Sequence, residues 1–156
     1  DIAIRAALTG HFVYSTLHTN DAPSAITRLT DMGVENYLLT SSLVAVLAQR
    51  LVRVICPHCK APDGVAATPE GELIETWRGA GCEFCFGTGF AGRIGIFEMM
   101  EMNQALRELV MRNADAAQLA AAARQYGMRT LREDGWQKVK AGITTAAEVI
   151  RVTQEF

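Results

Sequence analysis

The sequence has no long hydrophobic run and no excess of charge of either sign. Although 49% of its 156 residues are hydrophobic, no apolar stretch approaches the roughly 20 residues that a membrane-spanning helix needs. With 15 basic and 17 acidic residues the net charge is −2, so the chain as a whole has no field that attracts nucleic acid or an anionic membrane. We therefore expect one or two small globular domains, with no transmembrane segment and no nucleic-acid partner.

The sequence also lacks the common motifs for nucleotide binding and for a Ser/His/Asp triad. It contains no GxxxxGK[ST] phosphate loop, no glycine-rich fingerprint after a strand and no serine on an elbow motif. The glycine-rich segment "GTGFAGRIG" (residues 87–95) is predicted to be a turn before a strand. The opening "DIAIRAALTG" has neither an initiator Met nor the pattern of a signal peptide, and we expect a fragment of a longer protein that begins inside a helix.

Cysteine is scarce, and its four occurrences form two CxxC pairs, Cys56 with Cys59 and Cys82 with Cys85. In a chain without a signal peptide this spacing favours a tetrahedral zinc site, in which four thiolates leave no open coordination position. The predicted role of the metal is structural, and the predicted compartment is reducing cytoplasm. An iron–sulfur cluster and a thioredoxin-like redox pair are the alternatives. His58, inside the first pair, is predicted to lie at the surface without binding the metal.

Residues 1–53 have an α/β pattern, in which β-branched and aromatic runs alternate with helical periodicity. The second helix has clear end signals, since Asn20 or Asp21 can cap it, Pro23 fits its first turn and Gly33 can close it. The elements expected in this part are the end of a helix, a buried strand over residues 11–17, a helix from about residue 22, an apolar helix over residues 36–47 and a strand over residues 49–55.

Along the rest of the chain, the composition and the hydrophobic pattern change twice. Between the cysteine pairs apolar residues are sparse, so this segment needs a bound metal to fold. From Glu98 onward the pattern is helical, and two capping boxes, Thr130 with Glu133 and Thr145 with Glu148, begin the last two of four short helices. The predicted domains are residues 1–55, residues 56–97 and residues 98–156, the last being a small helical bundle.

A run of polar side chains, "STLHTND" (residues 15–21), stands between the predicted strand and the helix after it. Ligands of open α/β sheets bind at the carboxyl ends of strands, and a helix N-terminus presents free N–H groups to anions. Thr16, His18 and Thr19 could therefore bind a phosphate. Alternatively, the polar residues satisfy backbone groups and cap the helix, and the residues alone favour neither interpretation. His11, taken alone, fits a capping or packing role.

Several ordered segments together resemble the C-terminal half of the secretion ATPases that drive type II secretion and type IV pilus assembly. They span nearly the whole chain and comprise "AIRAALTGH", "STLHTNDAPSAITRLTDMGV", "AQRLVRVICPHCK", "GCEFCFGTGFAGRIGIFEM" and "TLREDGWQKVKAGITTAAEVIRVT". The tail "AGITTAAEVIRVT" (residues 141–153) is more similar to the type II branch than to the pilus branch. The resemblance implies an α/β fold: the C-terminal part of a RecA-like ATPase core, with an inserted zinc-binding knuckle and a small C-terminal helical bundle.

The resemblance also implies roles for individual residues. It places His11 and His18 in a histidine box that supports catalysis, with His18 near the γ-phosphate, and it assigns the four cysteines to a structural zinc ion. Thr19 is a further candidate for contacts to the nucleotide, and Arg50 and Arg53 are candidates for contacts to the nucleotide or to a neighbouring subunit. ATP and Mg²⁺ would be held by a Walker A loop and acidic residues upstream of this chain.

The whole protein would then be an ATP hydrolase, and this chain alone would be inactive. The resemblance implies a homohexamer at the cytoplasmic face of the bacterial inner membrane, which acts on an inner-membrane platform protein and on cytoplasmic-domain components of the machine. The alternative is a zinc-stapled interaction or chaperone-like module without nucleotide chemistry, because "CEFCFGTG" is similar to the cysteine-rich repeats of a chaperone family. That family repeats the motif four times, and this chain contains it once.

Overall fold

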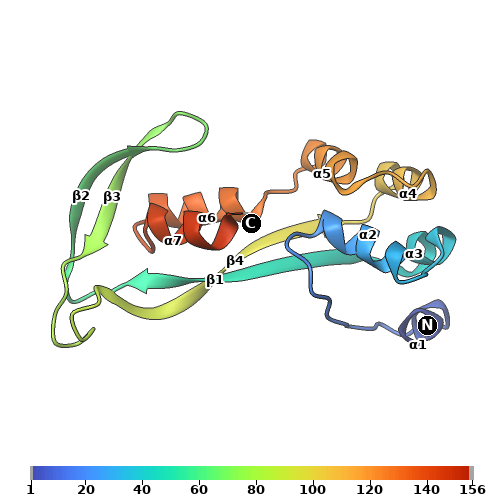
Figure 1. The fold of residues 1–156 in the computed structure, drawn as a ribbon, viewed down its shortest axis with the longest axis horizontal. Helices are drawn as coiled ribbons and strands as arrows, with labels where there is room; N and C mark the ends of the chain where they lie inside the picture. Colours follow the sequence, from blue (N-terminus) through green and yellow to red (C-terminus); the bar gives the residue numbers. More distant parts are fainter. Residues whose placement is uncertain (1, 155–156) are drawn as a thin grey trace. The chain divides into compact units, whose positions relative to one another are not determined.

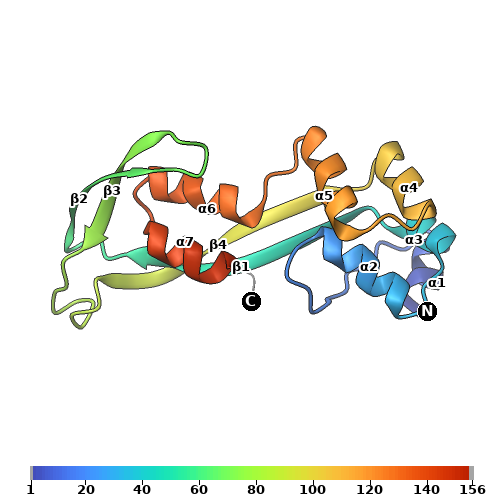
Figure 2. The same cartoon turned by 45° about the horizontal axis from the view of Figure 1, so that its top comes forward.

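The computed structural model describes residues 2–154, which form two compact units (Figures 1 and 2). Unit 1 comprises residues 2–48 and 98–129, and unit 2 comprises residues 49–97 and 130–154. The helices of unit 1 are α1 (Ile2–Leu8), α2 (Pro23–Asp31), α3 (Asn36–Ser42), α4 (Gln104–Met111) and α5 (Ala116–Gln125). Unit 2 contains β2 (Lys60–Ala67), β3 (Leu73–Gly79), α6 (Leu131–Lys140) and α7 (Ala146–Thr153), and each unit holds a section of β1 (Ala45–Ile55) and of β4 (Phe90–Glu101). The predicted mixed α/β class is confirmed.

Helix α2 begins and ends where the sequence predicts. Asp21 Oδ1 accepts a hydrogen bond from the Ser24 N–H at 2.7 Å, which satisfies one of the donors that a helix start leaves without an intrahelical partner. Pro23 occupies the first helical position, where its missing N–H costs nothing. After the helix, Gly33 has a φ of +87°, a left-handed conformation that glycine adopts readily.

The prediction of a buried strand over residues 11–17 is wrong. Residues 11–19 have no regular secondary structure, and the side chains of Phe12 and Tyr14 are 71% and 87% exposed. A buried strand needs hydrogen-bonded neighbours, whereas the strands of the described residues pair only as β1 with β4 and β2 with β3. The β-branched and aromatic residues therefore have strand propensity here without a partner strand.

The helix predicted over residues 36–47 is shorter in the structure. Helix α3 ends at Ser42, and Leu43 is already extended, with φ −80° and ψ 127°. Strand β1 then begins at Ala45, so the strand predicted over residues 49–55 is present and starts earlier. The error has a simple cause, because a short apolar run does not by itself distinguish a helix from a buried strand.

Strand β4 continues to Glu101, past the position at which the sequence predicts helix. Burial alternates along its end: Ile96, Glu98 and Met100 are buried, whereas Phe97 and Met99 are exposed. A period of two is the mark of a strand with one buried face. The segment "FEMMEM" contains no β-branched residue, so the sequence gives little sign of this strand.

All four predicted helices of the tail are present, but they belong to different units. In unit 1, α4 contacts α5 and α5 contacts α2, and in unit 2, α6 contacts α7 (Figure 2). The four helices are thus divided between the two compact units. Helical periodicity identifies an apolar face without identifying what covers it. The division into residues 1–55, 56–97 and 98–156 concerns the domains of the whole protein and stays a prediction.

The two predicted capping boxes have different outcomes. At the start of α6, the Thr130 N–H donates to Glu133 Oε2 at 2.8 Å and the Glu133 N–H donates to Thr130 Oγ1 at 3.2 Å, which completes the box. At the start of α7, Thr145 Oγ1 accepts from the Glu148 N–H at 3.3 Å, but the Glu148 carboxylate binds guanidinium groups instead of closing the box. The two arginines give this carboxylate several charge-assisted hydrogen bonds, whereas the capping box would give it one.

Glu148 fixes α7 to β1 inside unit 2. Its carboxylate is buried, with 2% of the residue exposed. Oε1 accepts from Arg53 Nη2 at 2.7 Å and Oε2 accepts from the Arg53 backbone N–H at 3.0 Å, while Arg151 donates from Nε at 3.0 Å and from Nη2 at 2.8 Å. The hydrogen bonds from Arg151 and then from Arg53 outweigh burial and lower the pKa of Glu148 to about 2.

Candidate metal centre and histidine loop

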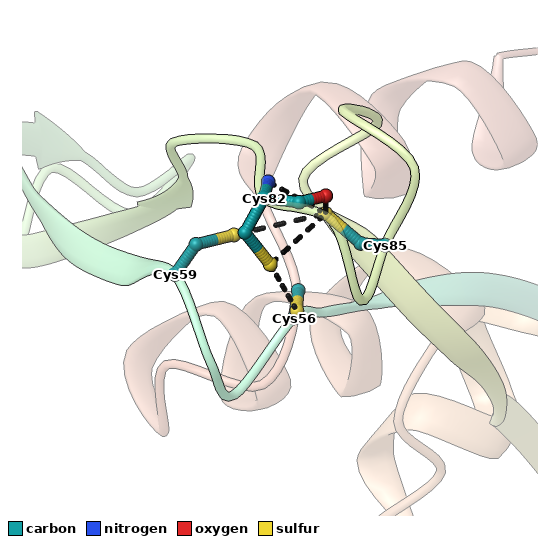
Figure 3. Close-up of side chains that lie close together, drawn as sticks. All are labelled: Cys56, Cys59, Cys82 and Cys85. Carbon is teal, nitrogen blue, oxygen red and sulfur yellow. Dashed lines mark hydrogen bonds between the residues drawn. The ribbon is translucent and has the colours of Figure 1, made fainter.

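The four cysteines come together at one point of unit 2 (Figure 3). Their sulfur atoms all lie within 4.8 Å of one another, and three of the Sγ···Sγ distances are 3.8 Å (Cys56 to Cys82), 3.8 Å (Cys59 to Cys85) and 3.7 Å (Cys82 to Cys85). Four sulfurs about 2.3 Å from a central zinc ion would be separated by about 3.8 Å, the edge of a regular tetrahedron. The spacing therefore fits a four-coordinate metal, and it is far too long for disulfides.

The β2–β3 hairpin brings the two CxxC pairs together. Lys60, the residue after Cys59, pairs with Gly79 at the open end of the hairpin, so the second pair returns close to the first. Next to the site, the backbone at Gly79 lies very close to the backbone at Gly89: a Cβ atom on Gly79 would lie 1.9 Å from the carbonyl oxygen of Gly89. A side chain cannot be placed at Gly79 without moving one backbone, and this close approach requires glycine.

Backbone N–H groups point at the sulfurs. The Gly81 N–H donates to Cys59 Sγ at 3.3 Å, and the N–H groups of Cys82 and Gly89 donate to Cys85 Sγ at 3.3 and 3.2 Å. Burial raises the pKa of Cys59 to about 12. Burial acts in the same direction on Cys85, but the N–H donors and the neighbouring thiols outweigh it and lower the pKa of Cys85 to about 6. Such donors stabilise thiolate, which is the form that binds a metal.

The prediction that His58 lies at the surface is confirmed. His58 is exposed, and its ring packs against Phe84 with 4.2 Å between the ring centroids. Among the described residues the group that could hold a metal consists of the four cysteines. Because all four ligands come from protein and none is missing, the centre leaves no position for substrate, and its arrangement is that of a structural site.

The histidine loop, which we define as residues 11–22, carries the second group of predicted site residues in unit 1. His11 Nδ1 and Thr9 Oγ1 lie 3.1 Å apart, so His11 has a local hydrogen-bond partner, as expected for a capping role. The side chain of His18 is exposed. Thr19 Oγ1 donates to the Asp21 carbonyl oxygen at 3.1 Å. Both histidines are thus at the surface of the described residues, where a ligand could reach them.

The start of α2 is already occupied by protein groups. The Ala22 N–H donates to Glu98 Oε1 at 2.7 Å, the Ser24 N–H donates to Asp21 Oδ1 at 2.7 Å, and the Ala25 N–H donates to the Ala22 carbonyl oxygen at 3.2 Å. A phosphate at this helix N-terminus would have to displace two carboxylates. The capping interpretation is therefore confirmed for Asp21, and contact with an anion is left to side chains such as His18.

Arg50 and Arg53 lie on the section of β1 that belongs to unit 2. Arg50 Nη1 donates to the Gln49 carbonyl oxygen at 3.1 Å, and Arg53 binds Glu148 while its guanidinium lies 4.1 Å above the Phe90 ring. The structure thus gives Arg53 a role in holding unit 2 together. The histidine loop belongs to the other unit, and a joint role of Arg50 with His18 and Thr19 stays a prediction.

The long-range partners of two buried carboxylates, Glu98 and Glu148, were not predictable from the sequence. Their exposed fractions are 4% and 2%, and each accepts a hydrogen bond from a backbone N–H far away in sequence, that of Ala22 and that of Arg53 respectively. A buried carboxylate requires such partners. A single Glu in a strand or helix carries no sign of a long-range partner, although Glu98 stands at an inward position of the β4 alternation.

Comparison with known proteins identifies the family to which this chain, with its cysteine cluster and histidine loop, belongs. The sequence profile described as "Type II/IV secretion system protein" matches residues 1–151. The chain belongs to this family. Among its relatives is the type II secretion system protein HxcR of Pseudomonas aeruginosa, which is 47% identical over 154 residues that make up 99% of this chain and 31% of that protein.

Relatives of both branches of the secretion-system family are similar to this chain. The type IV pilus assembly ATPase TfpB of Acinetobacter baylyi is 45% identical over 161 residues, which cover 97% of this chain and 28% of that protein. The type II secretion system protein E of Aeromonas hydrophila is 45% identical over 164 residues, which cover 99% of this chain and 32% of that protein. The chain spans about a third of the length of these relatives and corresponds to their C-terminal part. No helix within residues 2–154 combines the length and the apolar character that crossing a membrane requires.

Proposed function

We propose that this chain is the C-terminal part of an ATPase that powers type II secretion or the assembly of a type IV pilus or pseudopilus. The observation that carries the proposal is the match to the secretion-system family along residues 1–151, together with relatives that are named as ATPases. The identity of this chain to relatives of the two branches differs by only a few per cent. The preference for the type II branch therefore rests on the tail at residues 141–153.

In this proposal the nucleotide is held elsewhere in the whole protein. A Walker A loop upstream binds the phosphates and Mg²⁺, and an upstream acidic residue orients the attacking water. His18 contacts the γ-phosphate region, with His11 and Thr19 in supporting positions and Arg50 as a further candidate. The exposed position of His18 and the local hydrogen bonds of His11 and Thr19 are consistent with these roles. The chain alone, without a phosphate loop, hydrolyses no ATP.

We further propose that the metal is zinc and that its role is structural. The donor set of four cysteines, the tetrahedral spacing of the sulfurs and the N–H groups directed at them all suit Zn²⁺. The metal would hold the ends of β1, β3 and β4 together where apolar residues are few. The whole protein would be a homohexamer at the cytoplasmic face of the bacterial inner membrane, in contact with an inner-membrane platform protein and cytoplasmic-domain components of the machine.

The test is the binding of a fluorescent ATP analogue to the full-length protein and to residues 1–156 alone. We expect the full-length protein to contain a GxxxxGK[ST] loop before this segment and to bind the analogue, and the fragment to bind none. His18→Ala should weaken binding, whereas His58→Ala, a change to a surface histidine, should leave it unchanged. A full-length protein that lacks the phosphate loop and binds no nucleotide would instead support a zinc-stapled interaction module.

A further inference from the structure

Glu98 is a carboxyl side chain on the buried face of β4. Its neighbours on that face, Ile96 and Met100, are fully buried, and Glu98 itself is 4% exposed. Its Oε1 accepts the N–H of Ala22, 76 positions away in sequence, at 2.7 Å, and Ala22 is also fully buried. Removing a carboxylate from water is costly unless strong hydrogen bonds compensate. A hydrophobic residue would satisfy packing at this position, so the carboxylate calls for another explanation.

One hydrogen-bond partner of Glu98, Ala22, is the last residue of the histidine loop. The hydrogen bonds at this end of the loop include those from Thr19 Oγ1 to the Asp21 carbonyl oxygen, from the Ser24 N–H to Asp21 Oδ1 and from the Ala22 N–H to Glu98. The first two join residues two and three positions apart, and the second of them reaches only the first turn of α2. The third ties the loop to β4, and it does so four residues after His18. It therefore limits the backbone conformations available to the segment that carries His18.

We propose that Glu98 is a positioning residue for His18, which holds the histidine loop so that the imidazole meets the γ-phosphate of bound ATP. The proposal rests on the proposed function, in which His18 makes that contact. Positioning matters because a shift of about 1 Å in a catalytic group can cost about a hundredfold in rate. Glu98 touches no nucleotide; it acts on the backbone of the loop, and its effect passes through His18.

The experiment uses the full-length protein and the ratio of two dissociation constants, for ADP and for a non-hydrolysable ATP analogue. This ratio reports the γ-phosphate contact, whereas a general loss of stability changes both constants alike. His18→Ala and Glu98→Ala should each lower the preference for the ATP analogue, the latter by roughly tenfold. Glu98→Gln keeps an oxygen acceptor for the Ala22 N–H and should retain most of the preference. The matched control is Glu148→Gln, which removes another buried carboxylate, lowers thermal stability and leaves the ratio unchanged.

The double variant decides between positioning and an independent effect. If Glu98 acts through His18, then His18→Ala with Glu98→Ala should have the same ratio as His18→Ala alone. The inference would be overturned if Glu98→Ala changed the ratio of dissociation constants by the same factor in the wild-type protein and in His18→Ala. It would also be overturned if Glu98→Ala left the ratio unchanged. The proposed function would stand in both cases. If His18→Ala itself leaves the ratio unchanged, the proposed role of His18 fails and the inference with it. Should Glu98→Ala not fold, the same cycle is run with Glu98→Leu, which fills the buried site but cannot accept a hydrogen bond.

Discussion

Replacing Glu148 by Gln should destabilise unit 2 at neutral pH by about 1.5–3 kcal/mol. The pKa of Glu148 is about 2 in the folded protein against an ordinary value of 4.5, a difference of about 2.5 units, and each unit corresponds to about 1.36 kcal/mol. The full difference amounts to about 3 kcal/mol. Because the side chains of Arg53 and Arg151 are 49% and 58% exposed, solvent and salt reduce the benefit, which gives the lower end of the range.

The pH dependence of this effect has a definite sign. A carboxylate whose pKa is lowered by folding contributes its stability fully above its ordinary pKa, and the contribution is lost as pH falls through the folded-state value. The advantage of Glu148 over Gln should therefore be constant from pH 7 to about 5.5 and shrink between about pH 4.5 and pH 2. Arg53 and Arg151 stay charged throughout this window.

The assay is urea unfolding of the wild type and the Glu148→Gln variant at matched zinc concentration between pH 7 and pH 3. The difference between the two free energies of unfolding is the relevant quantity, because other titrating groups, including the cysteines, contribute alike to both. Glu72→Gln is the control: Glu72 forms an ion pair with Lys140 in which both side chains are about half exposed, and such pairs contribute only about 0–1 kcal/mol. A Glu148→Gln difference that stays the same from pH 7 to pH 3, or one no larger than that of Glu72→Gln, would refute the reasoning.

Three further predictions concern the metal centre and a helix cap. Metal analysis should find about one zinc ion per chain, and a chelator should first unfold the segment between residues 56 and 92, as seen by hydrogen exchange, since four protein ligands hold the metal there; iron or intact disulfides would contradict this. Gly79→Ala should lower zinc affinity in a competition titration because its Cβ would lie 1.9 Å from the Gly89 carbonyl oxygen. Gly64→Ala, whose Cβ meets no atom within 4 Å, strains the backbone at a φ of +89° and should cost stability without lowering zinc affinity. Thr130→Ala should lower the free energy of unfolding by about 1 kcal/mol in a urea titration, since it removes an N-cap, and an unchanged midpoint would show that the cap contributes little.

Local signals predicted the parts of the fold that local interactions determine. The start of α2 at Asp21 and Pro23, its end at Gly33 and the complete capping box at Thr130 follow from hydrogen bonds between residues a few positions apart. The metal centre was also predictable, because the spacing within a CxxC pair presents two thiolates on one turn. The hairpin that joins the two pairs could not be inferred in the same way.

The features that the sequence did not reveal depend on partners distant in the chain. Residues 11–17 have the composition of a strand but no neighbouring strand among the described residues, and the tail helices are divided between two units according to what covers their apolar faces. Glu148 satisfies a capping pattern, yet its carboxylate binds Arg53, 95 positions away. The partners of buried carboxylates such as Glu98 could not be predicted for the same reason, since the tertiary structure determines them.

The central claim is that this chain is the C-terminal part of an ATPase. ATP hydrolysis by the full-length protein tests this claim most directly. The account predicts Mg²⁺-dependent turnover by the full-length protein, a marked loss of turnover in His18→Ala with little change in His58→Ala, and no turnover by residues 1–156 alone. A full-length protein that hydrolyses no ATP, or a fragment that hydrolyses it without the upstream segment, would contradict the account.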